Sequence, residues 1–276
     1  MSLHLNGNTI GDLYVGGTKV GEAWFNGQKV YSSAPPVINY MFRDIDADGN
    51  LTQATGALED ASEITQIGDF GLNYAFQNCT GLTGSISFPS VTSIGICGLQ
   101  YAFNTCTGLT GSISFPSLTS IGIGGLGNAF NGCGSLTGSI SFPKLTSIGD
   151  FGLNYAFNFC TGLTGSISFP ELTSIGDKGL YYAFQGCTGL TGNISFPNLT
   201  SIGTSGLSYA FYGCSGLTGK ISFPSLTSIG TSGLVDVFYN CKGITEVHFK
   251  SSLSGNSECT ASNMGCTRAR VYFDLP

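Results

Sequence analysis

The sequence predicts a repeat solenoid of short parallel strands and helical turns, preceded by a small β-hairpin module. Three observations carry this prediction. Cysteine recurs with a 27-residue period through most of the chain, phenylalanine and proline recur with the same period, and residues 1–32 follow a separate ten-residue period. A fixed period of about 20 to 50 residues indicates one supersecondary unit per repeat, which buries its apolar face against its neighbours.

The composition bounds the class of protein. The chain has 276 residues, of which 41% are hydrophobic, so it can bury a continuous core. Only 9% are charged, the net charge is -6, and the 10 Lys and Arg residues are scattered singly. This distribution argues against nucleic acid as a partner, because such proteins need a basic patch. The sequence shows neither a signal peptide nor an apolar run of about 18 residues, so we expect no membrane insertion.

Residues 1–32 predict a β-hairpin module. Gly7, Gly17 and Gly27 recur with the ten-residue period in the segments LHLNGNTIG, LYVGGTKVG and AWFNGQKVY. Asn-Gly and Gly-Gly between alternating apolar residues favour hairpins, because a type I′ turn needs positive φ at both central residues. Residues 33–36 predict a linker, since their two prolines cannot donate to a β-ladder.

Residues 37–276 predict the solenoid itself. We assign 37–80 to an N-terminal cap and degenerate repeat, 81–242 to six regular 27-residue repeats, and 243–276 to a C-terminal cap. The cap assignment depends on Ile244 to Phe249, which copies the repeat strand with one residue missing, and on a final apolar strand at Val271 to Phe273. Without a cap the last coil would expose a sheet edge.

Each repeat divides into three pieces. Apolar residues alternate with Thr and Ser from Leu82 to Phe88, which predicts a strand with one buried face. Pro89 ends this strand, and a second extended piece turns Val91 and Ile94 inward. In the segment 98–106 the apolar residues follow the i, i+3, i+4, i+7 pattern of a helical turn. They are Leu99, Ala102, Phe103 and Cys106.

The motifs I-S-F-P, L-T-S-I-G and A-F-x-x-C resemble the BspA-like leucine-rich repeats of bacterial surface proteins, over roughly residues 55 to 250. The resemblance implies a right-handed leucine-rich-repeat solenoid with a binding or adhesion role. The repeat is a few residues longer than the familiar one, so we expect a bulkier helical side. Residues 1–32 resemble small modules of phage tail and virion-associated proteins, which implies attachment to a larger particle.

The cysteine column predicts buried thiols rather than a redox or metal array. If the turns pack like helices, equivalent cysteines lie about 8 to 10 Å apart, too far for a disulfide. Unbridged cysteine is among the most buried residue types. Cys259 and Cys266 follow the last full coil, and whether they pair in an oxidising setting stays open. The column consists of Cys79, Cys106, Cys133, Cys160, Cys187, Cys214 and Cys241.

Asp44, Asp46 and Asp48, followed by Gly49, match the opening of a calcium loop. Thr55 stands at position 12, where a bidentate glutamate is expected. A calcium site and an acidic capping turn both stay open. No other cofactor is predicted. His4 and His248 have no partner that the sequence places beside them, and no catalytic motif occurs, so we predict that the protein is not an enzyme.

A tyrosine column is the candidate binding face. On a helical turn, the residue two positions after the inward leucine points about 200° away from it, into solvent. Aromatic rings supply rigid contact area for binding. The alternative is that the tyrosines stack on one another and only cover the turns. The column consists of Tyr74, Tyr101, Tyr155, Tyr182 and Tyr209, interrupted by Asn128 and followed by Asp236.

These observations together predict a non-catalytic protein that binds a protein or glycan partner. The two resemblances favour a virion-associated recognition protein, with residues 1–32 as the attachment to the particle. The alternative is a secreted gut-bacterial adhesin whose signal peptide is absent from this chain. We therefore expect it on a virion, on a cell surface or outside the cell. An ice- or glycan-binding Thr/Ser strand face ranks last, because the pattern is Thr-x-Ser-x-Ser rather than a regular Thr-x-Thr.

Overall fold

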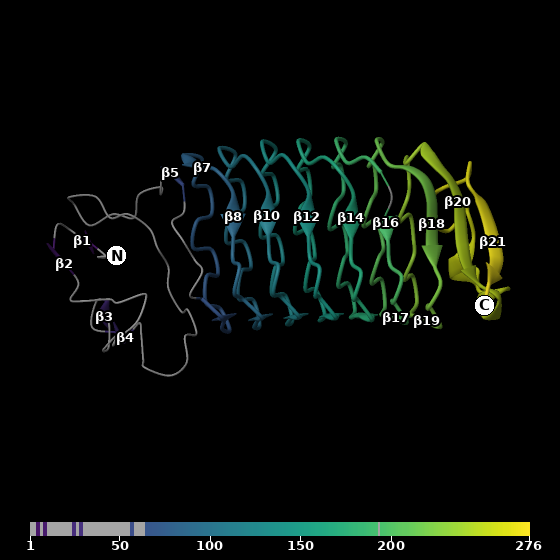
Figure 1. Ribbon diagram of the computed structural model, residues 1–276, viewed down its shortest axis with the longest axis horizontal. Coiled ribbons are helices and arrows are strands. Elements are labelled where there is room, and N and C mark those ends of the chain that lie inside the picture. Colours follow the sequence, from purple (N-terminus) through teal and green to yellow (C-terminus); the bar gives the residue numbers. More distant parts are fainter. Residues whose placement is uncertain are drawn as a thin grey trace.

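The protein winds into a stack of coils whose strands lie side by side along the long axis (Figure 1). A computed structural model describes residues 64–192 and 194–276, with five two-residue strands before them. Each regular coil contributes one strand to each of two parallel sheets. The predicted parallel-strand solenoid is therefore confirmed.

The first sheet contains eight strands and the second contains seven. The eight are β8 (Ile86–Ser87), β10 (Ile113–Ser114), β12 (Ile140–Ser141), β14 (Ile167–Ser168), β16 (Ile194–Ser195), β18 (Thr218–Phe223), β20 (Gly243–Lys250) and β21 (Arg270–Leu275). The seven are β6 (Gln66–Ile67), β9 (Ser93–Ile94), β11 (Ser120–Ile121), β13 (Ser147–Ile148), β15 (Ser174–Ile175), β17 (Ser201–Ile202) and β19 (Ser228–Ile229). The short helices η1 (Ser251–Leu253) and η2 (Ser257–Cys259) precede β21.

The strands before residue 64 form separate pairs. β1 (His4–Leu5) pairs with β2 (Asn8–Thr9), and β3 (Trp24–Phe25) pairs with β4 (Gln28–Lys29), both antiparallel. These pairs fall in two of the three predicted hairpins. β5 (Gly56–Ala57) pairs in parallel with β7 (Leu82–Thr83). The middle hairpin and the linker at 33–36 lie outside the described residues, and the domain boundaries stay a prediction.

The 27-residue register places each side chain on its equivalent in the next coil. Ile113 pairs with Ile86 on one side and Ile140 on the other. Two buried phenylalanine ladders run through the core. Ring centroids are 5.1 Å apart between Phe103 and Phe130 in the first ladder. Stacked rings add about 0.5 to 1.5 kcal/mol per pair to the burial of their surface.

Residues 98–106 and their equivalents form a chain of turns, so the predicted helical turn is wrong. No α-helix occurs within the described ranges. The N–H groups of Leu99 and Tyr101 donate to Gly125 and Gly127 on the next coil, whereas Ala102 donates to Leu99, three residues back. Alternate amides therefore bond between coils, where a helix would bond within itself.

The helical pattern nevertheless identified the inward residues correctly. All four apolar residues of the pattern are fully buried: Leu99, Ala102, Phe103 and Cys106. Cys97, Tyr101 and Thr105 have φ values of 51°, 56° and 56°, so the chain of turns repeats its backbone every four residues. A period of four lies close to the 3.6 residues of a helix, and both place i, i+3, i+4 and i+7 on one side.

The tail from Gly243 closes the last regular coil. β20 pairs with β18, and β21 pairs with β20, both in parallel. Turn-segment amides of the last coil need acceptors that a further coil would supply. Glu258 Oε1 and Oε2 accept from Ser232 N at 2.9 Å and Leu234 N at 3.2 Å. The carbonyls of Asn263 and Met264 accept from Asp236 and Phe238.

Glu258 therefore gives a test of this closure. Glu258→Ala removes the acceptor of two backbone amides, and we expect a loss of about 1 to 3 kcal/mol in the free energy of unfolding. Denaturant unfolding measures the loss, and amide exchange at Ser232 and Leu234 should accelerate. The matched control is Glu171→Ala, because Glu171 is exposed on a regular coil. Equal stability of the two variants would contradict this role.

Candidate functional site: the aromatic turn face

The chain of turns forms one side of the solenoid, which we call the turn face: residues 68–79 and their equivalents in each later coil. Every exposed large hydrophobic side chain of the described residues lies on it. They are Phe70, Tyr74, Ile96, Ile123, Phe151, Phe159 and Tyr239. Contiguous exposed apolar surface marks interaction sites in soluble proteins. The turn face is therefore the candidate functional site.

The predicted tyrosine column lies on the turn face in two stacks. Ring centroids are 4.9 Å apart between Tyr155 and Tyr182, and 4.5 Å apart between Tyr182 and Tyr209. Tyr74 and Tyr101 form a second stack at 4.8 Å, and Asn128 separates the two. The rings pack on one another and are still partly exposed. The tyrosines therefore stack on one another, as the alternative interpretation expected, and they also expose part of their rings to solvent. Their role in binding stays a prediction.

The column tyrosines have left-handed backbone conformations. The φ values of Tyr155, Tyr182 and Tyr209 are 52°, 54° and 58°. A bulky residue at such a φ costs on the order of 1 to 2 kcal/mol. The inter-coil hydrogen bonds hold the backbone there, and stacking offsets part of the cost. These positions project outward in every coil, which aligns the rings.

Burial raises the pKa of Tyr155, Tyr182 and Tyr209, and the neighbouring Tyr181 hydroxyl adds to the effect. The hydroxyl groups are therefore neutral at physiological pH. Each can both donate and accept a hydrogen bond, so the rim of the stack offers polar contacts beside the rings.

Other aromatic residues extend this surface. Tyr181 lies edge-on to Tyr182, with centroids 4.5 Å apart, and Lys178 Nζ lies 5.4 Å from the Phe151 ring. The sequence analysis did not select Phe151 or Phe159. The signal was present, because Phe151 and Phe159 lie four residues before and after Tyr155. They were missed because the equivalent positions of other coils hold other residues, such as Lys178 and Gly186, so neither phenylalanine belongs to a column.

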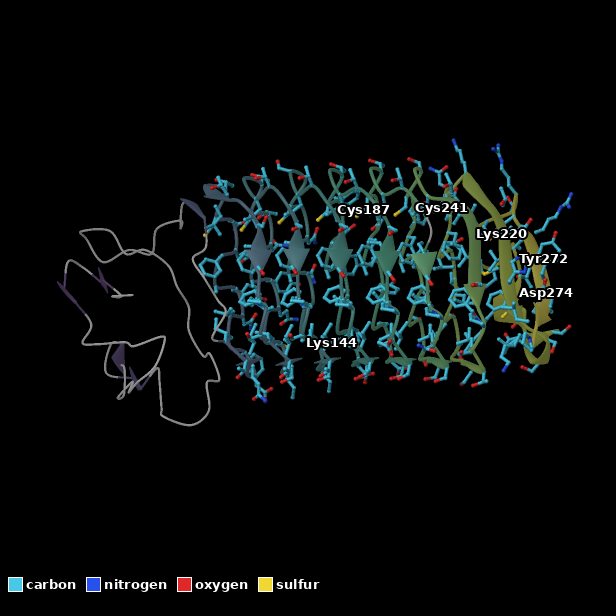
Figure 2. All side chains as sticks on the ribbon, in the orientation of Figure 1. Lys144, Cys187, Lys220, Cys241, Tyr272 and Asp274 are labelled. Carbon is cyan, nitrogen blue, oxygen red and sulfur yellow. The ribbon has the colours of Figure 1, made fainter. Side chains whose placement is uncertain are left out.

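The cysteine column is buried, and none of the ten cysteines forms a disulfide. Cys187 and Cys241 lie in one row along the solenoid (Figure 2). The helix-like spacing predicted for the column is wrong, because the coils stack at the spacing of β-strands. Six thiols instead donate to phenylalanine carbonyls of the preceding coil; Cys160 Sγ lies 3.0 Å from Phe130 O.

Burial makes these thiols poor nucleophiles and poor metal ligands. It raises the pKa of Cys187 to about 12. Cys259 and Cys266 are also buried thiols without a disulfide, and burial raises their pKa values to about 12 and about 11. The thiolate is the reactive form, and these thiols stay protonated. The cysteine column therefore serves packing rather than redox chemistry.

The described residues contain no metal site and no membrane-spanning helix. No three His, Cys, Asp or Glu side chains of residues 64–192 and 194–276 converge on a possible metal position. The proposed calcium residues, Asp44, Asp46 and Asp48, lie outside the described part of the chain. Within that part, no helix has the length and hydropathy to cross a membrane.

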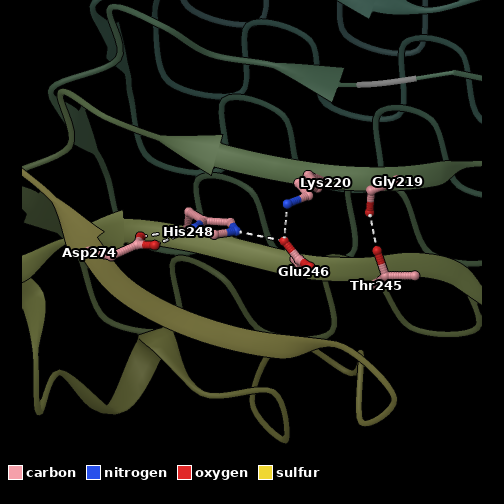
Figure 3. A network of polar contacts seen from close by, with 6 residues as sticks. All are labelled: Gly219, Lys220, Thr245, Glu246, His248 and Asp274. Atoms are coloured by element: carbon pink, nitrogen blue, oxygen red, sulfur yellow. Dashed lines mark hydrogen bonds and ion pairs between the residues drawn. The ribbon is translucent and has the colours of Figure 1, made fainter.

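A charged cluster lies on the outer face of the first sheet at its C-terminal end (Figure 3). His248 Nδ1 lies 2.9 Å from Asp274 Oδ1, and its Nε2 lies 3.0 Å from Glu246 Oε2. Lys220 Nζ pairs with Glu246 Oε2 at 2.6 Å, and Tyr272 stacks on the imidazole at 4.7 Å. The sequence analysis missed this cluster because Asp274 lies about one coil after His248, in the irregular tail.

This cluster links strands and offers no catalytic arrangement. Partial burial lowers the pKa of His248, but hydrogen bonds and charge from Asp274 and Glu246 outweigh it, so the net pKa is raised. Hydrogen bonds from Lys220 and His248 lower the pKa of Glu246. Carboxylates occupy both ring nitrogens, so the imidazole has no nitrogen left to activate a nucleophile. It joins β20 to β21 instead.

The repeats match a known family. The BspA type leucine-rich repeat region matches residues 72–181 and 154–267, in six copies. The chain belongs to this BspA-type leucine-rich-repeat family. A comparison with curated proteins finds no match.

Solved leucine-rich-repeat structures are also similar to this BspA-type protein. One from Bacteroides ovatus is 25% identical, covers 79% of this chain and has a TM-score of 0.37; this chain spans 60% of its length. One from T. pallidum is 20% identical over 86% of this chain and 97% of that one, with a TM-score of 0.39. A leucine-rich cell surface protein from Faecalibacterium prausnitzii is 18% identical over 83% and 92%, with a TM-score of 0.28.

The His248 cluster predicts a pH-dependent contribution to stability. The pKa of His248 in the folded protein lies above the ordinary value of about 6.5, so protonated His248 stabilises the fold. This stabilisation is fully present below about pH 6.5 and is lost as the pH rises through the folded-state pKa. We expect His248→Gln to destabilise the protein by up to about 1 kcal/mol at pH 5.5 and less at pH 8.5. Denaturant unfolding at the two pH values measures this. A pH-independent difference between variant and native chain would contradict it.

Proposed function

We propose that this BspA-type protein recognises a protein or glycan partner through its turn face and performs no catalysis. One observation carries the proposal: among the described residues, exposed large hydrophobic side chains occur only on this face. Tyr155, Tyr182 and Tyr209 form its centre, and Tyr181 and Lys178 border them. Binding surfaces are enriched in such rigid, amphipathic rings.

The outward faces of the two sheets are less suited to binding than the turn face. Before β18, the outward positions of the first sheet are mostly small hydroxyl side chains, such as Ser141, Ser168 and Ser195, which are exposed. Threonines at the second sheet donate to the preceding coil: Thr146 Oγ1 lies 2.9 Å from Thr119 O. These groups offer hydrogen bonds but little apolar area, so the aromatic face supplies the larger share of binding free energy.

The absence of catalysis rests on the chemistry of the groups described above. Burial keeps the column thiols protonated, and carboxylates occupy the His248 ring. A repeat solenoid of this family is generally an interaction scaffold. An extended surface of equivalent positions suits recognition, because side chains can vary from coil to coil without disturbing the core.

We place this recognition at a surface, either of a virion or of a bacterial cell. The resemblance of residues 1–32 to virion-associated modules favours attachment to a particle through that segment, which lies largely outside the described residues. A secreted bacterial adhesin is the alternative, and the family membership favours it equally. Neighbouring genes distinguish the two: tail genes support the first and export or sortase genes support the second.

The tyrosine column tests the binding role directly. The variant Tyr155→Asn, Tyr182→Asn, Tyr209→Asn copies Asn128, the residue that the column itself uses at φ 54°. Labelled protein is applied to a glycan array and to immobilised bacterial and epithelial cells. We expect at least a tenfold loss of affinity, or about 1.4 kcal/mol, because the ring area is removed.

Stability separates binding from packing in the same variant. Lost stacking costs about 0.5 to 1.5 kcal/mol per pair, and asparagine relieves part of the left-handed strain, so the unfolding midpoint should fall little. The matched control changes Ser141, Ser168 and Ser195 to Asn on the strand face and should bind normally. Intact binding in the tyrosine variant, a collapse of its stability, or no binding by the native chain would contradict the proposal.

A further inference from the structure

A small cleft lies where the turn face meets the C-terminal tail. It has a volume of about 190 Å³, and Tyr239, Lys242, Cys266 and Arg268 are among its lining residues. Pockets for drug-sized ligands measure about 300 to 1,000 Å³, so this cleft can hold one ring or one side chain rather than a long segment.

Tyr239 lines this cleft. Its side chain is 46% exposed, and the ring of Tyr212 on the preceding coil stacks on it, with centroids 4.6 Å apart. On the other side the tail follows, and Gly265 lies against Tyr239 there. Among the described residues, no second aromatic ring stacks on Tyr239, so part of its ring stays open to a ligand.

A glycine lets the tail pack closely against Tyr239 at this cleft. Gly265 has a φ of 69°, and a Cβ atom there would lie 2.8 Å from Tyr239 Cβ. Any side chain at this position would therefore push against Tyr239. The same Cβ would lie 2.8 Å from Asp236 Oδ1, so a larger residue at this position would also displace that carboxylate.

Two cations line the cleft in an acidic protein. The chain has a net charge of -6 and only 10 Lys and Arg residues. Lys242 and Arg268 are both exposed, and neither makes an ion pair with another described residue. Two cations and a partly exposed aromatic ring in one cleft favour a ligand that combines a ring with a negative charge.

We infer that this cleft binds a carboxylate-bearing sugar residue at the end of a glycan. The sugar ring packs on the exposed part of the Tyr239 ring, and its carboxylate pairs with Lys242 and Arg268. The inference rests on the proposed recognition function and names the ligand class for one end of the turn face.

The experiment compares acidic sugars with their uncharged esters. Trisaccharides ending in glucuronic acid or sialic acid, and the methyl ester of each, are titrated by calorimetry against the full chain. We expect at least one of the two acids to bind at least tenfold more tightly than its ester. Whichever acid binds identifies the source of the carboxylate. In the variant Lys242→Gln, Arg268→Gln this preference should disappear.

A charge-matched control isolates the cleft from general electrostatics. Lys144→Gln, Arg270→Gln removes two exposed cations elsewhere and should keep the preference for the acid. Tyr239→Ser should weaken acid and ester alike, because both lose the stacking surface. Equal binding of acid and ester by the native chain, an unchanged preference in the cleft variant, or preferred binding of a phosphopeptide over both sugars would overturn the inference.

The sugar titration and the cell-binding assay together distinguish failure of this inference from failure of the proposed function. If the variant with asparagine at positions 155, 182 and 209 binds cells normally while the cleft variant loses the acidic sugar, the inference about the cleft holds and the proposed binding role of the tyrosine column fails. If the native chain binds cells through the tyrosine column but shows no preference for the acids, only the inference about the cleft fails.

Discussion

Hydrogen bonding between successive coils is the interaction on which the rest of this protein depends. It operates in both parallel sheets and continues through the turn segments, where alternate amides such as those of Leu153 and Phe157 donate to the next coil. The whole circumference therefore advances by one strand spacing, about 4.8 Å, per repeat. An α-helical turn at the same place would need about twice that distance between neighbours.

This spacing explains why the repeat is so uniform. At about 5 Å, each side chain contacts its own equivalent, so flat phenylalanine rings stack and bulky irregular side chains do not fit. Cysteine is small enough for this spacing, and its thiol donates a hydrogen bond to a carbonyl of the preceding coil. The same constraint forces left-handed conformations at outward positions of the turn face, and it aligns the tyrosines there. The candidate site is thus a consequence of the backbone that supports it.

Much of this could be predicted from the sequence, because a strict 27-residue period fixes the solenoid and its inward columns. The pattern of Leu99, Ala102, Phe103 and Cys106 was sufficient to identify the buried side. It could not identify the turn conformation, since the decisive acceptors, such as Gly125 and Gly127, lie on another coil. The error in coil spacing followed from this, and so did the mistaken reason for the unbridged cysteines.

The candidate functional residues also divide into those that the repeat pattern predicts and those that it does not. The tyrosine column was visible as a repeated letter, whereas the Glu258 closure, the His248 cluster and the cleft at Tyr239 join residues of the irregular tail. Their spacing follows no period, so only the folded chain brings them together. The tail also shows why repeat proteins need terminal caps. The amides of the last coil have no next coil to accept their hydrogen bonds, so residues outside the repeat must supply the acceptors.

Scalar couplings across hydrogen bonds test the central claim most directly. In a deuterated sample, NMR should detect couplings from the amide nitrogens of Leu153, Tyr155 and Phe157 to the carbonyl carbons of Gly179, Tyr181 and Ala183, the acceptors on the next coil. Couplings to carbonyls four residues back in the same coil would instead show a helix. That result would contradict the coil spacing, the stacked ladders and the geometry of the turn face together.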